Sequence, residues 1–214
     1  MSIRFEDLVE TIKKAKELSK SKKFIQSYEL IVKLKDVDFK QPENRFSELI
    51  QLPNPPLNKL AKVAVIADGD MALKAREAGA DAVVTRDVLE KTASSKKDAK
   101  KIARTYDIFI AQSDLMPIVG RSLGRYLGPR GKMPQPVPST VDLKPLIERA
   151  KKSVRVRVRD QPQIQCKIGS ESQDPKEVGE NALAVINFLL GRFKLHNIEK
   201  VYIKLTMGPP VKVE

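Results

Sequence analysis

The stretch AKVAVIAD, residues 61–68, contains an unbroken apolar run from Val63 to Ala67. A strand with one face in water alternates polar and apolar residues, whereas a strand covered on both faces does not. Comparable stretches recur in DAVVT at 81–85 and DIFIAQ at 107–112, with helical patterns between them. The resulting βαβαβ order predicts a parallel sheet with helices on both faces and right-handed crossovers.

Three helices are expected around these strands. DMALKAREAGA at 70–80 and a lysine-rich helix that runs through Arg104 would connect the strands, and SDLMPIVGRSLGRYLG at 113–128 would follow the third. Residues 62–152 are therefore expected to form an α/β, Rossmann-like domain of three layers.

Outside this block the period of the apolar residues changes. One helical face is predicted near the amino terminus, at Phe5, Leu8, Val9, Ile12 and Ala15. In FIQSYELIVKLK, residues 24–35, the pattern alternates as in a half-buried strand. The predicted buried positions are Tyr28, Leu30, Val32 and Leu34, and the predicted polar positions are Ser27, Glu29, Lys33 and Lys35.

The antiparallel style returns after Lys152. VRVRVRDQPQIQCKIG, residues 154–169, is interpreted as a hairpin that turns around Asp160 and Pro162. Asp174 followed by Pro175 is typical of a helix start, and KVYIKLTMGPP at 200–210 alternates as a closing strand.

These patterns predict two domains of mixed class, α/β and α+β. Residues 1–61 and 153–214 would form one discontinuous α+β domain, into which the α/β domain at 62–152 is inserted. The crossings would be LPNPPLNK at 52–59 and ERAKK at 148–152. Two crossings of this kind predict a hinge between the domains.

The charge of the chain favours a polyanionic partner. Its 214 residues include 40 Lys and Arg against 27 Asp and Glu, a net charge of +13. Cys166 is the single cysteine and alternates with Ile164 and Ile168, which predicts a buried strand position and no internal disulfide. With His196 as the single histidine, neither a metal site nor another cofactor is expected.

We expect a cytoplasmic protein without a membrane segment. The amino terminus MSIRFEDLVE lacks the apolar core of a signal peptide, and the longest apolar run, ALAVINFLLG at 182–191, is shorter than a bilayer requires.

Two other classes of function compete with nucleic-acid binding. A nucleotide enzyme would need a glycine-rich phosphate loop after the first inserted strand, where Gly69 stands alone, and no GxxxxGK[ST] motif occurs. A hinged small-molecule sensor would use polar groups after the inserted strands, for which Gly69, Asp70 and Ser113 are the candidates. Glu29 has an alternative role as a cross-strand partner of a hairpin arginine.

Basic residues gather in three places. A lysine-rich run at 96–104 would be a solvated helix face, and the arginines at 155, 157 and 159 would contact phosphate or form salt bridges. GRSLGRYLGPRGKMPQPVP at 120–138 is rich in glycine and proline and contains no acid.

Four stretches together resemble a known family. LGRYLGPRGKMPQPVPST at 123–140 resembles the signature of the L-one family of large-subunit ribosomal proteins, the universal stalk protein, in its archaeal form. KFIQSYEL at 23–30, QIQCKIGSE at 163–171 and KLTMGPPVKV at 204–213 agree with the same family in the same order. The resemblance extends over the whole chain.

The resemblance implies a structural protein without catalytic activity, located in the cytoplasm on the large ribosomal subunit. Members bind a stalk element of large-subunit ribosomal RNA beside the exit site and help discharged transfer RNA to leave. Many also bind their own messenger RNA and repress its translation. No membrane partner is implied, and we expect a monomer when the protein is free.

The resemblance implies RNA contacts at the positions of this chain that match the family's RNA-binding residues. Residues on the polar faces of the same strands are added to this set. The expected RNA-binding residues are Lys23, Phe24, Ser27, Glu29, Lys33, Lys167, Gly169, Lys204, Thr206, Met207, Gly208 and Pro209. Secondary, salt-sensitive contacts to RNA or transfer RNA are expected from Arg121, Arg125, Arg130 and Lys132.

Overall fold

The computed structural model describes residues 4–41, 44–56, 58, 60–159 and 161–213. The chain divides into two compact units, one formed by Met1–Leu60 with Lys152–Glu214 and the other by Ala61–Lys151. Each unit has its own hydrophobic core and is described separately.

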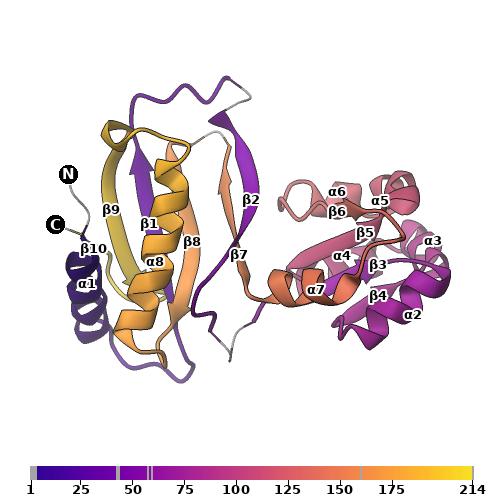
Figure 1. Cartoon of the computed structure of the whole chain (residues 1–214), viewed down its shortest axis with the longest axis horizontal. Helices are drawn as coiled ribbons and strands as arrows, with labels where there is room; N and C mark the ends of the chain where they lie inside the picture. The colour runs from indigo at the N-terminus through magenta and orange to yellow at the C-terminus, as the bar shows by residue number, and fades with distance from the viewer. Residues whose placement is uncertain (1–3, 42–43, 57, 59, 160, 214) are drawn as a thin grey trace. The chain divides into compact units, whose positions relative to one another are not determined.

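The first unit is built on an antiparallel sheet of four strands in the order β10-β9-β1-β8. Strand β1, Ser27–Leu34, is central and pairs with both β8, Gln163–Ser170, and β9, Ile198–Leu205. Strand β10, Val211–Lys212, pairs with the outer edge of β9. Segments from both ends of the chain therefore meet in one sheet (Figure 1).

Two helices cover one face of this sheet, α1 at Phe5–Glu17 and α8 at Pro175–Leu190 (Figure 1). The β1 side chains that face them are the predicted apolar set, each at most 1% exposed: Tyr28, Leu30, Val32 and Leu34. The predicted start of α8 is also confirmed, because the Asp174 carboxylate accepts a hydrogen bond from the Lys176 amide and Pro175 is the first helical residue. A short 3-10 turn, Leu195–Asn197, precedes β9.

The predicted hairpin at 154–169 is wrong. Strand β7, Ser153–Val158, pairs with β2, Phe46–Gln51, in a separate two-stranded sheet, while β8 pairs with β1. The six residues of β2 were not predicted as a strand, and they supply the ladder that β7 was expected to find in β8. The turn residue Asp160 lies outside the described residues.

The second unit contains a parallel sheet in the order β4-β3-β5-β6, and its first three strands confirm the predicted βαβαβ order. The strands are β3, Val63–Ile66; β4, Ala82–Val84; β5, Ile108–Gln112; and β6, Gln135–Val137. Strand β6 was not predicted. The helices are α2, Gly69–Glu77; α3, Arg86–Ser94; α4, Lys96–Thr105; the 3-10 turn η3, Ser113–Leu115; α5, Met116–Ser122; α6, Gly124–Leu127; and α7, Leu143–Lys151.

The lysine-rich segment before β5 forms two helices and not one. Ser95 is extended, at φ −111° and ψ 99°, and its hydroxyl accepts a hydrogen bond from the Asp98 amide at 3.3 Å. A serine that caps the next turn competes with continued helix, which explains the break.

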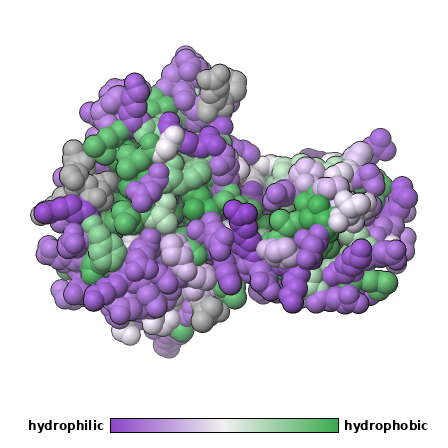
Figure 2. Space-filling model, in the orientation of Figure 1, coloured by the Kyte–Doolittle hydropathy of each residue, from purple (hydrophilic) through white to green (hydrophobic). Residues whose placement is uncertain are grey.

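The surface agrees with the high charged fraction of the chain, because hydrophilic side chains cover most of the face in view (Figure 2). Among the described residues, no helix has both the length and the apolar character needed to cross a bilayer.

Candidate nucleic-acid interface

The uncovered face of the first sheet carries a row of alternating charge. Helices α1 and α8 cover the Tyr28 face, so Glu29 projects to the other side. In register, Glu29 lies between Lys167 on β8 and Lys204 on β9. Residues directly opposite on neighbouring antiparallel strands place their side chains side by side. The row therefore presents two ammonium groups with one carboxylate between them.

The cross-strand neighbours of Glu29 are lysines, and this corrects the alternative that paired it with a hairpin arginine. The arginines lie on β7, which belongs to the other sheet of this unit. Glu29 is half-buried, as are both lysines.

Lys33 lies at the other end of β1 from Ser27. It lies four positions along the strand from Glu29, a distance of about 13 Å. Its ammonium pairs with the Glu199 carboxylate at 2.9 Å, and hydrogen bonding to Lys33 lowers the pKa of Glu199. Lys33 is therefore engaged within the sheet and stands apart from the other expected contacts.

Thr206 fastens the end of β9 to the start of β1. Its hydroxyl accepts from the Ser27 amide at 3.2 Å and donates to the Ser27 carbonyl at 3.3 Å. The Thr206 amide donates to the same carbonyl at 3.1 Å. Two of the expected RNA-binding residues are thus held together by direct hydrogen bonds.

Large apolar side chains stand in solvent at this end of the sheet. Phe24 is 51% exposed, Ile25 is 49% exposed and Met207 is 62% exposed. A groove of about 370 Å³ runs beside Phe24 and is lined by Lys22, Lys23, Phe24, Ile25, Glu171 and Ser172. An exposed aromatic ring among lysines suits an unstacked base and its phosphates.

Gly208 allows a close approach within the protein. A Cβ atom at this position would lie 3.2 Å from both Cβ and Oγ of Ser19. The turn after β9 therefore packs on the linker after α1, and the shape of the expected RNA surface depends on this contact. Pro209 follows it and is exposed.

Gly169 faces the helical side of the sheet. A Cβ atom here would come within 2.8 Å of Val178 Cγ2 on α8 and 3.0 Å of Gln173 Oε1. Gly169 is buried, and it is opposite Tyr28, whose side chain belongs to the core. The structure thus gives this glycine a packing role on the face opposite to Glu29.

Gln26 was not predicted as part of the site; it is 0% exposed and lies between the expected contacts at Phe24 and Ser27. Its side-chain carbonyl accepts from the Met207 amide at 3.0 Å. A signal was present, because the alternation that buries Tyr28 and Leu30 also places Gln26 on the covered face. A buried amide must find hydrogen-bond partners, so its position implies a structural network.

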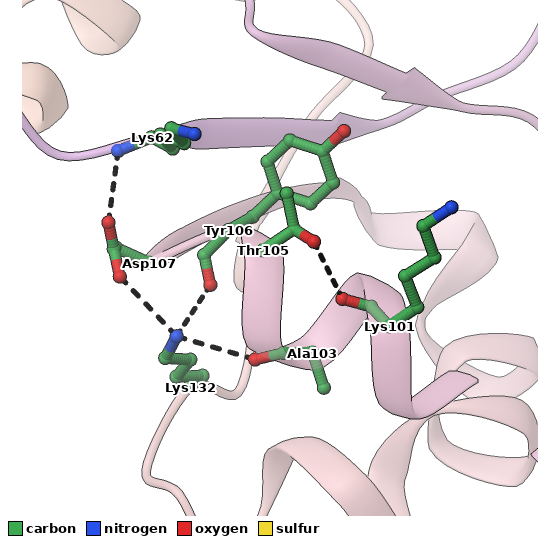
Figure 3. A network of polar contacts seen from close by, with 7 residues as sticks. All are labelled: Lys62, Lys101, Ala103, Thr105, Tyr106, Asp107 and Lys132. Carbon is green, nitrogen blue, oxygen red and sulfur yellow. Dashed lines mark hydrogen bonds and ion pairs between the residues drawn. The ribbon is translucent and has the colours of Figure 1, made fainter. Parts of the chain in front are cut away.

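In the second unit, Arg121, Arg125 and Arg130 are exposed, as secondary contacts require. Lys132 is different, because its ammonium donates to the carbonyls of Ala103 at 3.3 Å and Tyr106 at 2.6 Å (Figure 3). It also lies 3.4 Å from the Asp107 carboxylate. A cation at the last carbonyls of α4 stabilises the end of that helix. Lys132 therefore ties the loop to α4.

Another cationic surface of the first unit includes Arg157, near the end of β7, and Arg159, just after it. A groove of about 470 Å³ is lined by Arg157, Arg159, Gln161, Gln163 and Gln165. Burial, and then repulsion from Arg157, lowers the pKa of Arg155. These side chains can meet phosphate with both charge and hydrogen bonds.

The residues considered for rival functions have structural roles. Gly69 opens α2 and donates its amide to the Asp68 carboxylate at 3.0 Å, Asp70 lies in the first turn of α2, and Ser113 begins a 3-10 turn. Cys166 is buried in β8 as predicted, and burial raises the pKa of its thiol to about 12. Within the described ranges, no three His, Cys, Asp or Glu side chains gather as a metal site would require.

Comparison with known proteins agrees with the resemblance of the four sequence stretches. The profile of the Ribosomal protein L1p/L10e family matches residues 8–209. "Large ribosomal subunit protein uL1" of Thermofilum pendens is 58% identical over 96% of this chain and 92% of its own length. The proteins of the same description from Pyrobaculum islandicum and Methanothermobacter thermautotrophicus are 48% and 44% identical, over 98% and 97% of this chain and 94% and 99% of their own lengths.

Proposed function

The chain belongs to the Ribosomal protein L1p/L10e family, and from this premise we propose that it binds a stalk element of large-subunit ribosomal RNA beside the exit site. Family membership makes it a structural, non-enzymatic protein of the large ribosomal subunit, located in the cytoplasm. The observation that carries the proposal is the Lys167–Glu29–Lys204 row. It lies next to the hydrogen bonds between Thr206 and Ser27, which we call the Thr206 clamp.

The row suits the shallow minor groove of folded RNA. Lys167 and Lys204 would contact phosphate oxygens, while the Glu29 carboxylate would accept a hydrogen bond from a ribose 2′-hydroxyl. The Glu29 carboxylate would repel a phosphate group placed directly against it. It therefore favours a ribose hydroxyl over a phosphate at the centre of the row. The sheet holds all three groups at fixed spacing, and shape can therefore decide between RNA folds.

The exposed end of the sheet would add contacts to bases. Phe24 and Met207 offer apolar surface, and Lys23 stands beside Phe24 at the rim of the groove. We assign the specific contacts to this end of the first unit. The residues that would form its backbone surface and set its shape are Ser27, Thr206, Gly208 and Pro209. Lys33 and Gly169 have the weakest support, because one is paired and the other faces α8.

Exposed arginines of the second unit would add sequence-independent attraction. Arg121, Arg125 and Arg130 are placed to meet RNA backbone or transfer RNA, each contributing a salt-sensitive contact. Through these contacts the protein would help discharged transfer RNA to leave the exit site. We do not include Lys132 among these RNA contacts, because its ammonium donates to backbone carbonyls of the same unit.

Repression of its own messenger RNA would use the same surface. A messenger that folds like the ribosomal element would present the same minor-groove shape to the row around Glu29. The two RNAs would then compete, and the free protein would act as a monomer.

Filter binding tests the proposal with a ribosomal stalk RNA fragment, the leader of its own messenger and an unrelated hairpin, across a salt series. We expect tight binding to the stalk fragment that survives salt, competition from the messenger leader, and loss of the unrelated hairpin. Equal and steeply salt-dependent binding to all three RNAs would show that the net charge alone accounts for binding, and would contradict the proposal.

A pair of matched variants tests the site within the same experiment. Glu29→Gln changes the proposed 2′-hydroxyl acceptor, whereas Glu199→Gln changes a carboxylate paired with Lys33 at the far end of the same strands. We expect about tenfold weaker binding for the first and little change for the second. Equal effects of the two would contradict the assigned site.

A further inference from the structure

We propose that Gln26 is the positioning residue of the RNA-binding surface, whose buried amide locks the Met207 turn to the linker after α1. The proposal rests on the proposed function, and it adds a residue that makes no contact with RNA itself. Gln26 is 0% exposed, so its influence must pass through its hydrogen bonds.

Each polar group of the Gln26 side chain is satisfied by a different segment. The carbonyl Oε1 accepts from the Met207 amide at 3.0 Å, at the end of β9. The amide Nε2 donates to Ser19 Oγ at 3.1 Å and to the Lys20 carbonyl at 3.4 Å, both in the linker between α1 and β1. One side chain therefore joins segments about 180 residues apart in sequence.

The backbone of Gln26 adds the third segment. Its amide donates to Glu171 Oε2 at 3.1 Å, and its carbonyl accepts from the Glu171 amide at 3.0 Å. Glu171 also lines the groove beside Phe24. Three segments, before β1, after β8 and after β9, thus converge on one residue, and the first and last of them carry expected RNA contacts.

The chemistry of the site requires an amide. The Met207 amide is a donor, so it needs an acceptor, while the Lys20 carbonyl is an acceptor and needs a donor. A glutamine supplies both from one planar group, and an apolar residue supplies neither. The same bond places Ser19 where a Gly208 Cβ would be 3.2 Å from it, so the position of the turn depends on the linker that Gln26 holds.

The position of the Met207 backbone follows from this arrangement. Met207 is 62% exposed, and its own packing cannot fix the turn. Without the Gln26 bonds, the turn would sample several positions, and RNA would have to select one of them. Affinity falls by the fraction of the protein that is competent to bind.

The test compares Gln26→Leu with Asn181→Leu. Asn181 is also 0% exposed, and its side chain joins the Asn54 amide and carbonyl to the Ile168 carbonyl, away from Met207. Both variants remove a buried amide of the first unit. We expect Gln26→Leu to bind the stalk RNA fragment at least tenfold more weakly, and Asn181→Leu to differ from wild type only by its unfolded fraction.

A second readout needs no RNA. Amide hydrogen exchange at Met207, measured against the β1 amides as an internal standard, should speed up in Gln26→Leu and stay unchanged in Asn181→Leu. Unchanged exchange at Met207 in Gln26→Leu overturns the inference. If wild type itself does not discriminate the stalk fragment, the proposed function fails, and this exchange measurement alone still decides the role of Gln26.

The conservative variant Gln26→Glu remains informative if Gln26→Leu does not fold. A neutral carboxylic acid can accept from the Met207 amide and donate to the Lys20 carbonyl, whereas a carboxylate cannot donate to that carbonyl. Burial and the Glu171 carboxylate would raise the pKa of the new acid, while the ammonium groups of Lys16 and Lys20 would lower it. Relative to wild type at each pH, we expect recovery of affinity at about pH 5.5 and a loss at about pH 8. An affinity ratio that is independent of pH would contradict the amide role.

Discussion

Replacing Thr206 by valine tests the clamp between the two ends of the chain. Valine has the shape of threonine but carries a methyl group where the hydroxyl stands. The substitution removes an acceptor 3.2 Å from the Ser27 amide and a donor 3.3 Å from the Ser27 carbonyl. The carbonyl keeps the Thr206 amide as a donor at 3.1 Å, so the main loss is the acceptor for the Ser27 amide.

The magnitude follows from the partial burial of this pair. Removing one hydrogen-bond partner from a buried group costs about 1–3 kcal/mol, and half-exposed groups lie at the lower end. We therefore expect about 1 kcal/mol less free energy of unfolding for the first unit, or a Tm lower by about 3–5 °C. If the RNA-binding geometry shares this loss, RNA affinity falls about fivefold.

Calorimetry of wild type, Thr206→Val and Thr206→Ser measures the effect, with filter binding to the stalk RNA fragment alongside. Serine keeps the hydroxyl, so Thr206→Ser should melt within about 1–2 °C of wild type and bind nearly as well. A wild-type Tm for Thr206→Val, or equal losses for valine and serine, would refute the clamp.

Four further outcomes are expected. Met207→Ala should weaken RNA binding about tenfold with an unchanged Tm, because the side chain is exposed; filter binding with calorimetry checks both. Arg125→Ala should lower the slope of log K against log salt by about 0.9 and leave high-salt affinity unchanged in a salt titration. Lys132→Met should destabilise the second unit by about 1–2 kcal/mol in a chemical melt, because its ammonium holds the Ala103 and Tyr106 carbonyls. Cys166 should resist a thiol reagent at neutral pH until the protein unfolds, because burial raises its pKa to about 12; absorbance of the released thiolate follows it.

The period of the apolar residues was sufficient to predict most of the fold. Strand β1 alternates except at Ile31, and its predicted buried residues are buried in the structure: Tyr28, Leu30, Val32 and Leu34. The continuous run at β3 likewise predicted a strand covered on both faces, and Val63–Ile66 is fully buried. Both signals are local, because a side chain's face depends on its position along one strand.

Strand pairing was less predictable from the sequence. The β7 and β8 segments have good alternation and a turn between them, yet each pairs with a strand more than 100 residues away in sequence. Alternation shows which residues share a face, but the backbone hydrogen bonds of a ladder can form with any partner of suitable register. The short strands β2 and β6 were missed for the same reason, because their formation depends on the partners that they meet.

For the candidate site, the sequence by itself determined the residue types: a polar strand face with Glu29, an alternating partner strand with Lys204 and Thr206, and a basic, proline-rich loop. Tertiary structure alone decided which of them meet. It placed Glu29 between two lysines and directed Gly169 toward α8. It also bonded the Lys132 ammonium to the end of α4 and made Gln26 the common partner of three segments. The reason is physical: face and propensity are properties of neighbours in sequence, whereas hydrogen-bond partners of buried groups are chosen only when distant segments close the same core.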